Sequence, residues 1–470
     1  MSAIRMAIAM RYPLTPDETY YWVWSRHLAY GYTDHPPMVA WLIALTAPFG
    51  KAALGVRLPF ILCEALAAIG AGRAAMILSG NPLAGTAATL TVLLIPQGRL
   101  AVGEALPDGP YLASWALTIW FAAQLVKQPS RRTAIALGLT MGAALLSRFF
   151  GWALIAGIIF YSIAPVRRML WRQGLWLALL IAALIYAPFI AWNATHNWSN
   201  LAFTFATRQP VQGFSADRLQ IITSLRLIVF TAALWIVAYF TIIRPRYPLL
   251  AWTALPFPTA VALLSFFQTT ESYYILGPLI SLCVAIGIAY ARQSAPRRRG
   301  WLIAGLIPAA YVIASALFVA LPEAAQASLM RSTGGALRGP FFSQAFVFAR
   351  MSEDVRALSK GSVVFTNRLE LAGELTYHGG RASIVGSAPQ VPQWTEWYGD
   401  ATPARVLLVT FNPISQEADL NARIAASFAQ TSPGPILRYR FAGVDAVPFY
   451  TTWCESPRPN ARALLFRLQR

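Results

Sequence analysis

The feature that most limits the fold of this chain is a series of long apolar segments between residues 54 and 321. Hydrophobic residues make up 57% of the 470 residues, and charged residues only 12%. A soluble domain has no need for repeated runs of this length, whereas about 20 consecutive apolar residues in a helix cross a bilayer. The sequence therefore predicts a polytopic α-helical membrane protein.

Ten apolar runs are candidate membrane spans, and we expect about ten to twelve spans in all. They extend over about 54–78, 83–98, 111–126, 133–147, 152–164, 171–192, 219–243, 248–267, 273–291 and 301–321. Segment 38–49 is brief and amphipathic, which suits the membrane interface. Residues 2–10 are too short for a cleavable signal or a full span. We expect that the assigned start is late, or else that the first helix is truncated.

Acidic and basic residues occur in alternate loops. The basic loops contain no Asp or Glu and hold Lys127, Arg131, Arg132, Arg167, Arg168, Arg172, Arg244, Arg246, Arg292, Arg297, Arg298 and Arg299. The intervening loops hold Asp17, Glu18, Asp34, Glu104, Asp108, Asp217 and Glu271. Short basic loops stay in the cytoplasm, so we expect the acidic loops on the opposite face. The net charge of +19 is then explained by topology, without a nucleic-acid partner.

The chain changes character beyond residue 321, where charges return and turn residues multiply. Residues 361–366 and 405–411 are typical of short buried strands, and 369–377 has helical spacing. We expect a membrane domain over 1–325 and a small α/β domain over 330–470 on the non-cytoplasmic side.

The three cysteines are predicted to be structural thiols. Cys63 and Cys283 fall inside apolar runs, and Cys454 stands alone in the tail. Neither a disulfide framework nor a thiolate metal site can be drawn from these positions.

Four carboxylates are expected on the acidic face, namely Asp17, Glu18, Glu104 and Asp108. A general base needs such a group, and so does a divalent cation such as Mg²⁺ or Mn²⁺. Asp17 and Glu18 are adjacent and so point about 100° apart on a helix, where one can act in chemistry while the other is structural. Thr15 and Pro16 precede them as at a helix start, which leaves capping open for Glu18.

Several cations accompany these carboxylates and are candidates for binding phosphate: His27, His35, Arg57, Arg148 and Arg208. Any one of them alone is more often an interfacial anchor. Arg148 lies on the acidic side, against the positive-inside tendency, which favours an anionic ligand. The neighbouring aromatic residues fit an interfacial belt and sugar stacking equally well; they are Tyr20, Tyr21, Trp22, Trp24, Tyr30 and Tyr32. Without a Walker motif, this set predicts transfer from a lipid phosphate donor.

Several motifs resemble those of bacterial GT-C glycosyltransferases related to protein O-mannosyltransferases and to the lipid A aminoarabinose transferase. The longest are PDETYYWVWSRHL at 16–28, GYTDHPPMVAWL at 31–42 and EALPDG at 104–109. Shorter ones lie at 57–59, 146–149, 188–193, 196–198 and 273–278. The resemblance covers the membrane part throughout and the tail more loosely. The missing first helix is its main departure.

The resemblance implies an inverting transfer of a monosaccharide from a polyprenyl phosphate to a lipid, glycan or protein acceptor. The site would face the periplasm from the bacterial inner membrane. Asp17 would be the general base, and Asp108 would hold the acceptor or a divalent ion, with Glu104 as a further candidate. His35 replaces a lysine of the aminoarabinose enzymes and would bind the leaving phosphate. Further phosphate candidates are Arg57, Arg148 and Arg208, and the residues expected to line the lipid and sugar are Tyr21, Tyr32, Tyr273 and Tyr274.

Two other classes of function remain open at this point. A transporter or flippase of lipid-linked sugars would also place cations and aromatic residues at the membrane surface. The first full span does carry Glu64 and Arg73, although no repeat typical of transporters is visible. In a third interpretation, the tail is a recognition module on a membrane scaffold.

Overall fold

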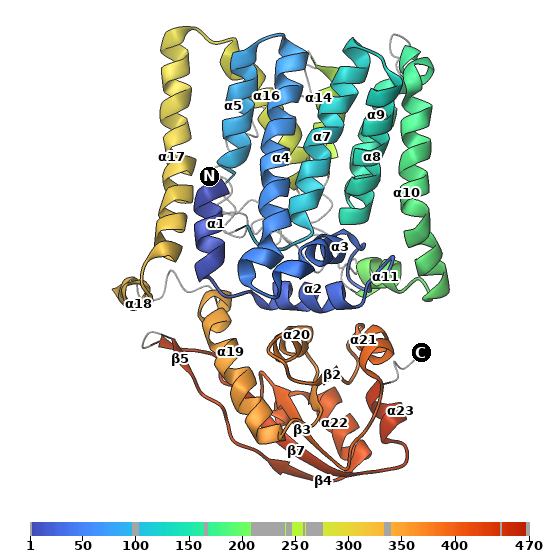
Figure 1. The fold of residues 1–470 in the computed structure, drawn as a ribbon, viewed down its shortest axis with the longest axis vertical. Helices are drawn as coiled ribbons and strands as arrows, with labels where there is room; N and C mark the ends of the chain where they lie inside the picture. Colours follow the sequence, from blue (N-terminus) through green and yellow to red (C-terminus); the bar gives the residue numbers. More distant parts are fainter. Residues whose placement is uncertain are drawn as a thin grey trace. The chain divides into compact units, whose positions relative to one another are not determined.

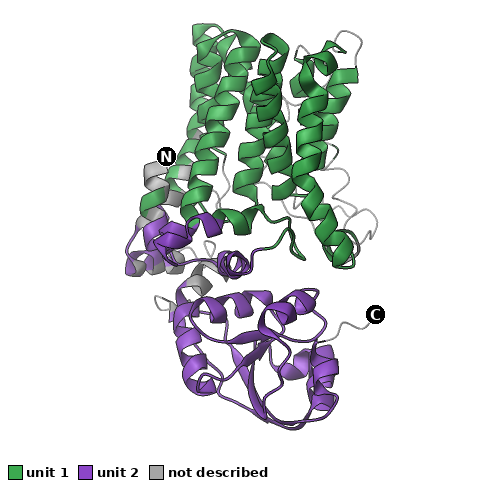
Figure 2. Ribbon diagram, turned by 45° about the vertical axis from the view of Figure 1, so that its right-hand side comes forward, with its two compact units in different colours: residues 1–8, 29–42, 57–316 green, residues 9–28, 43–56, 317–470 purple. Residues whose placement is uncertain are grey.

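The fold is described here from a computed structural model. The description covers residues 2–95, 103–163, 168–207, 247–256, 276–332, 340–441 and 444–466, together with 240 and 259. Two compact units are present (Figure 2). The helical unit comprises Met1–Ile8, Ala29–Leu42 and Arg57–Ala316, and the α/β unit comprises Ala9–Leu28, Ile43–Val56 and Leu317–Arg470.

The helical unit is a bundle whose helices run roughly parallel or antiparallel to one another (Figure 1). Its longer helices are α4 (Ala53–Ser79), α5 (Pro82–Leu93), α7 (Asp108–Lys127), α8 (Arg131–Ser147), α9 (Gly151–Ile163), α10 (Trp176–Thr195), α16 (Leu276–Ala291) and α17 (Ala295–Ala320). Shorter elements are α3 (Met38–Leu45), the π-helix η3 (Trp171–Leu175), α11 (Ser199–Ala202), the π-helix η4 (Phe203–Thr207) and α14 (Pro248–Ala254). Helix α1 (Ser2–Arg11) precedes them.

Small residues let the helices of this bundle approach closely. A Cβ added at Gly138 of α8 would lie 2.6 Å from the Ala178 carbonyl oxygen of α10. A Cβ at Gly287 of α16 would lie 2.5 Å from the Ala84 carbonyl oxygen of α5. Such contacts are typical of helices that pack in lipid, where backbone proximity replaces the hydrophobic effect.

Among the described residues, two helical segments are long and apolar enough to cross a bilayer, Ala53–Ser79 and Trp171–Thr195. Helices α5, α9 and α16 are apolar but shorter. The number of spans therefore stays a prediction. The candidate span 219–243 lies outside the described residues, apart from 240.

The α/β unit is built on a five-stranded sheet with the order β2-β1-β3-β7-β4. The strands are β1 (Val364–Thr366), β2 (Ala382–Ile384), β3 (Arg405–Thr410), β4 (Phe428–Pro433) and β7 (Tyr450–Pro457), and a separate ribbon holds β5 (Arg440–Phe441) and β6 (Val444–Asp445). The helices are α2 (Pro16–Arg26), η1 (Ala47–Phe49), α18 (Glu323–Ser332), α19 (Pro340–Ser359), α20 (Leu369–Tyr377), α21 (Val391–Tyr398), η6 (Ile414–Gln416), α22 (Ala418–Ser427) and α23 (Ala461–Phe466).

Strand β1 is parallel to both β2 and β3, whereas β7 is antiparallel to β3 and β4. Leu407 and Leu408 of β3 are fully buried, as expected for a central strand covered on both faces. The two strands and the helix expected from sequence are thus confirmed, as β1, β3 and α20.

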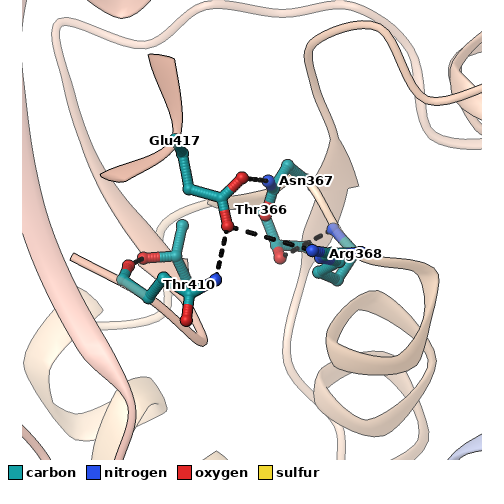
Figure 3. A network of polar contacts seen from close by, with 6 residues as sticks. Thr366, Asn367, Arg368, Thr410 and Glu417 are labelled. Atoms are coloured by element: carbon teal, nitrogen blue, oxygen red, sulfur yellow. Dashed lines mark hydrogen bonds and ion pairs between the residues drawn. The ribbon is translucent and has the colours of Figure 1, made fainter. Parts of the chain in front are cut away.

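A polar network follows the carboxyl ends of β1 and β3 (Figure 3). The Glu417 carboxylate accepts a hydrogen bond from Asn367 Nδ2 at 3.3 Å and another from Asn412 Nδ2 at 2.8 Å. Arg368 Nη2 lies 3.9 Å from the same carboxylate. The network ties the segments after both strands to the start of α22.

The α/β unit also contains two segments from the N-terminal part of the chain, 9–28 and 43–56. The domain boundaries expected at 1–325 and 330–470 remain a prediction. Compactness in this structure nevertheless groups the segment bearing Asp17 with the C-terminal sheet.

Candidate functional site

The first turn of α2 carries the two adjacent acids. Pro16 occupies the first helical position, where its missing N–H costs nothing, and both acids lie at the positive end of the helix dipole. Glu18 is fully buried, and its Oε2 accepts a hydrogen bond from the Thr15 backbone N–H at 2.8 Å. This is the contact of a capping residue. Asp17 is half-buried on the same turn.

Helix α2 lies against α20 at very short range. A Cβ at Gly373 of α20 would lie 2.9 Å from the Tyr20 backbone nitrogen and 3.0 Å from its Cα. Trp22 meets the Tyr377 ring edge-on, with centroids 5.1 Å apart. The close contact between α2 and α20, called here the α2–α20 seam, therefore depends on the absence of a side chain at Gly373.

The aromatic residues of the motif are largely internal to the α/β unit. Tyr21 is 7% exposed and packs edge-on against Trp24 at 5.0 Å. Tyr20 stacks on Trp394 of α21 at 6.1 Å. His27 stacks on Trp397 at 4.8 Å, and burial lowers the pKa of its imidazole. We interpret this cluster as the packing that holds α2 against α21, a role that composition alone did not indicate.

Glu374 is a buried acid that the sequence analysis missed. It is 1% exposed on α20, with its Oε2 3.5 Å from His378 Nε2. Burial raises the pKa of Glu374, and the Glu18 carboxylate raises it further, while His378 and Thr19 lower it. The signal that could have found it is its helical spacing, which places Glu374 on the same face as the buried Leu371.

In the helical unit, Asp108 and Arg148 form a buried ion pair. Arg148 Nη2 lies 2.7 Å from Asp108 Oδ2, and the side chains are 7% and 6% exposed. Asp108 begins α7 and Arg148 directly follows α8. Because these helices are antiparallel and joined by a short loop, the start of one and the end of the other meet. Asp108 Oδ1 has no hydrogen-bond partner among the described residues.

Arg57 lies on the face of α4 that packs against the segment leading into α7. Phe60 and Ile61 share this face and would contact a Cβ at Gly109 and at Gly103, at 3.3 Å and 2.6 Å. Arg57 is fully buried.

Glu104, on that same segment, is 9% exposed, and Glu64 of α4 is 6% exposed. Buried charges of this kind are maintained only by partners or by function.

The loop that carries Asp34 and His35 is fastened to the end of the bundle where α10 finishes. Asn200 Nδ2 of α11 donates to the Tyr32 and Thr33 carbonyl oxygens at 2.9 and 3.1 Å. Tyr32 is fully buried, Asp34 is 8% exposed and His35 is half-buried.

The starts of α4 and α7, the ends of α8 and α10, and α11 lie at the same end of the bundle (Figure 1). Phe149, next to Arg148, packs edge-on against Phe205 of η4 at 4.8 Å, which joins the end of α8 to the segment after α11. The structure thus brings Arg57, Glu104, Asp108 and Arg148 to one end of the helical unit.

Three predicted site residues, Arg208, Tyr273 and Tyr274, lie outside the described residues. In the part of the chain that is described, no group of three or more His, Cys, Asp or Glu side chains is arranged to hold a metal ion.

Residues 34–192 match the family model of dolichyl-phosphate-mannose-protein mannosyltransferases. The lipid A galacturonosyltransferase RgtD of Rhizobium johnstonii is 25% identical over 385 residues, which cover 77% of this chain and 76% of the relative. The chain is therefore similar in sequence to glycosyltransferases of both kinds.

Crystal structures of ArnT from Cupriavidus metallidurans share the GT-C fold of this chain. The apo structure superposes with a TM-score of 0.62, and the structure bound to undecaprenyl phosphate with 0.65. Each is 16% identical in sequence, and the superposition covers 96% of both chains. The resemblance expected from the motifs is thus confirmed, together with a helical membrane GT-C fold. The family match includes Asp108, Arg148 and Arg57.

Proposed function

We propose that this protein is an inverting glycosyltransferase that transfers a monosaccharide from a polyprenyl phosphate to an acceptor hydroxyl at the periplasmic face of the inner membrane. The observation that carries the proposal is the buried Asp108–Arg148 pair in the segment that matches the mannosyltransferase family. The pair keeps a guanidinium and a carboxylate with one unbonded oxygen at the end of the bundle that also carries Arg57.

In this proposal Asp17 is the general base. It would take the proton of the acceptor hydroxyl as the hydroxyl oxygen attacks C1 of the sugar and the bond from C1 to the phosphate oxygen breaks. The hydrogen bond from Thr15 assigns the capping role on this turn to Glu18, which supports the choice of Asp17.

The leaving phosphate gains negative charge as its bond to C1 breaks. Arg57, Arg148 and His35 would stabilise it through charge-assisted hydrogen bonds, which are strongest where water is excluded. Asp108 would position the acceptor through Oδ1. Together with Glu104 it is also the place where a divalent cation such as Mg²⁺ or Mn²⁺ would bind, since Mg²⁺ commonly uses one or two carboxylates.

A lipid A-type acceptor is the one to test first, because the relative from Rhizobium johnstonii carries that acceptor in its name. The assay combines the purified protein in detergent with a panel of polyprenyl phosphate sugars and lipid A, and mass spectrometry detects the product. Wild-type protein should yield glycosylated lipid A.

Asp17→Asn should lower transfer by several orders of magnitude without changing the melting temperature. The matched control is Asp445→Asn, which makes the same chemical change at an exposed ion pair of the β5–β6 ribbon. An Asp17→Asn variant with full activity would remove Asp17 from the mechanism. Movement of lipid-linked sugar across vesicles without any transfer product would favour the transporter instead.

A further inference from the structure

The α/β unit has a small pocket at the edge of the sheet where the parallel strands β1 and β2 begin. Three segments line it: the last turns of α19, the turn that leads into β1, and the turn between α20 and β2. Its volume of about 140 Å³ is enough for one tetrahedral oxyanion and not for a sugar chain. All of its walls belong to the C-terminal part of this unit.

The lining combines two guanidinium groups with three hydroxyl groups and no acid. Arg356 and Arg381 supply the charge, and Ser352, Ser359 and Ser362 supply the hydroxyls. Among the described residues, neither arginine forms an ion pair with a carboxylate. A guanidinium group without a carboxylate partner is suited to phosphate, because two of its parallel N–H groups can bind two phosphate oxygens.

Ser352 is the residue that points most directly to a ligand. It is 4% exposed, it lines the pocket, and its Oγ has no hydrogen-bond partner among the described residues. A buried hydroxyl without a partner is unfavourable, so a ligand oxygen here would complete its hydrogen bonding. Ser352, Arg356 and Ser359 recur at helical spacing on α19 and therefore share one face.

The glycines of the two turns allow the backbone conformations that border the pocket. Gly379 has a φ of +89°, and a Cβ there would lie 3.6 Å from Arg356 Nη1. Gly361 also has a positive φ, of +76°, as the chain turns out of α19. Larger residues would be strained at both positions.

The two helix ends at this edge provide an alternative explanation for the arginines. Helices α19 and α20 both end here, and each carbonyl end carries about half a negative charge. Two guanidinium groups bring two positive charges, so they exceed the helix ends by about one unit. Neutralising the dipoles accounts for only half of the charge, and it leaves the unpartnered Ser352 hydroxyl unexplained.

We infer that this pocket binds a phosphate-class oxyanion, either a phosphate monoester on a lipid or inorganic phosphate itself. Arg356 and Arg381 hold the anion between them, and the Ser352 hydroxyl donates to it from the floor. The inference does not depend on the proposed transfer reaction, because binding is measured without a sugar donor.

The test uses the full-length protein in detergent and in nanodiscs. Isothermal titration with inorganic phosphate should give saturable binding, and Arg356→Gln/Arg381→Gln should weaken it about tenfold or more. Ser352→Ala keeps the charge and removes only the hydroxyl, so it should weaken binding about threefold with an unchanged melting temperature. The matched control is Arg438→Gln/Arg440→Gln, which removes two exposed guanidinium groups of the same unit outside the pocket.

Nanodiscs of phosphatidylcholine with and without phosphatidic acid distinguish a lipid phosphate monoester from free inorganic phosphate as the ligand. A rise in melting temperature with phosphatidic acid that the Arg356→Gln/Arg381→Gln variant loses indicates a lipid monoester. Saturable phosphate binding without that rise indicates the free anion. The inference is overturned if neither probe binds, or if the Arg438→Gln/Arg440→Gln control loses as much binding as the pocket variant.

Discussion

A single substitution should lower the stability of the protein most where it breaks the Asp108–Arg148 ion pair. Arg148→Met would leave the buried Asp108 carboxylate without its cation, which typically costs about 3–5 kcal/mol. We expect a clear drop in melting temperature in detergent. Asp108→Asn/Arg148→Met removes both charges, so it should recover much of the stability while transfer stays low.

The control for this prediction is Arg440→Gln, which breaks an exposed pair with Asp445 and should leave the melting temperature unchanged. A double variant no more stable than Arg148→Met would mean that the two charges are not coupled.

Substitutions at Glu18 and at Asp17 should cause different defects: loss of stability at Glu18 and loss of transfer at Asp17. Glu18→Ala removes the acceptor of the Thr15 N–H and should destabilise the protein by about 1 kcal/mol, as loss of a helix cap does. Glu18→Gln keeps an acceptor oxygen and should restore most of that stability. Thermal melts of both variants test this, and equal losses from Ala and Gln would argue against the capping role.

At the scale of elements, the α2–α20 seam should not tolerate a larger side chain at Gly373. Gly373→Val would force a side chain to within about 3 Å of the Tyr20 backbone, an overpacking that typically costs about 1–3 kcal/mol. We expect a lower melting temperature and slower transfer, because α2 carries Asp17. Gly305→Ala in α17 is the control, since a Cβ there meets nothing within 4 Å.

The same seam should make stability depend on pH. Burial raises the pKa of Glu374, so the folded state binds a proton that the unfolded state releases at lower pH. Stability should therefore fall as the pH rises from the ordinary pKa of glutamate through the raised one. Glu374→Gln stays neutral and should flatten this decline. His378→Gln separates the contribution of the neighbouring imidazole, and melts recorded across this pH range test both variants.

At the scale of the whole molecule, the fold of segment 9–28, which carries Asp17, should depend on the C-terminal residues of the same unit. A chain truncated to 1–325 loses α20 and α21, the partners of Tyr20 and Trp22. Segment 9–28 should then lose its fold, and trypsin should cut at Arg26 far faster than in the full chain. Equal protection in both forms would show instead that 1–325 folds by itself, as the domain boundaries from sequence predict.

The sequence by itself was sufficient for the class of fold and for two of the five strands of the small sheet. Repeated apolar runs specify membrane helices, and β1, α20 and β3 follow from periodicity within a few residues, because such patterns depend only on neighbours along the chain. The motifs likewise predicted the resemblance to GT-C glycosyltransferases, which the similar proteins confirm. They also left Glu18 open between capping and chemistry, and the structure places it at a cap.

Only the tertiary structure decided which distant residues meet. The pairing of Asp108 with Arg148, the grouping of segment 9–28 with the C-terminal sheet, and the buried Glu374 all join parts of the chain that are far apart in sequence. The pocket at Arg356 and Arg381 has the same origin. The physical reason is that burial and charge pairing depend on which helix faces which, and local periodicity does not encode that choice.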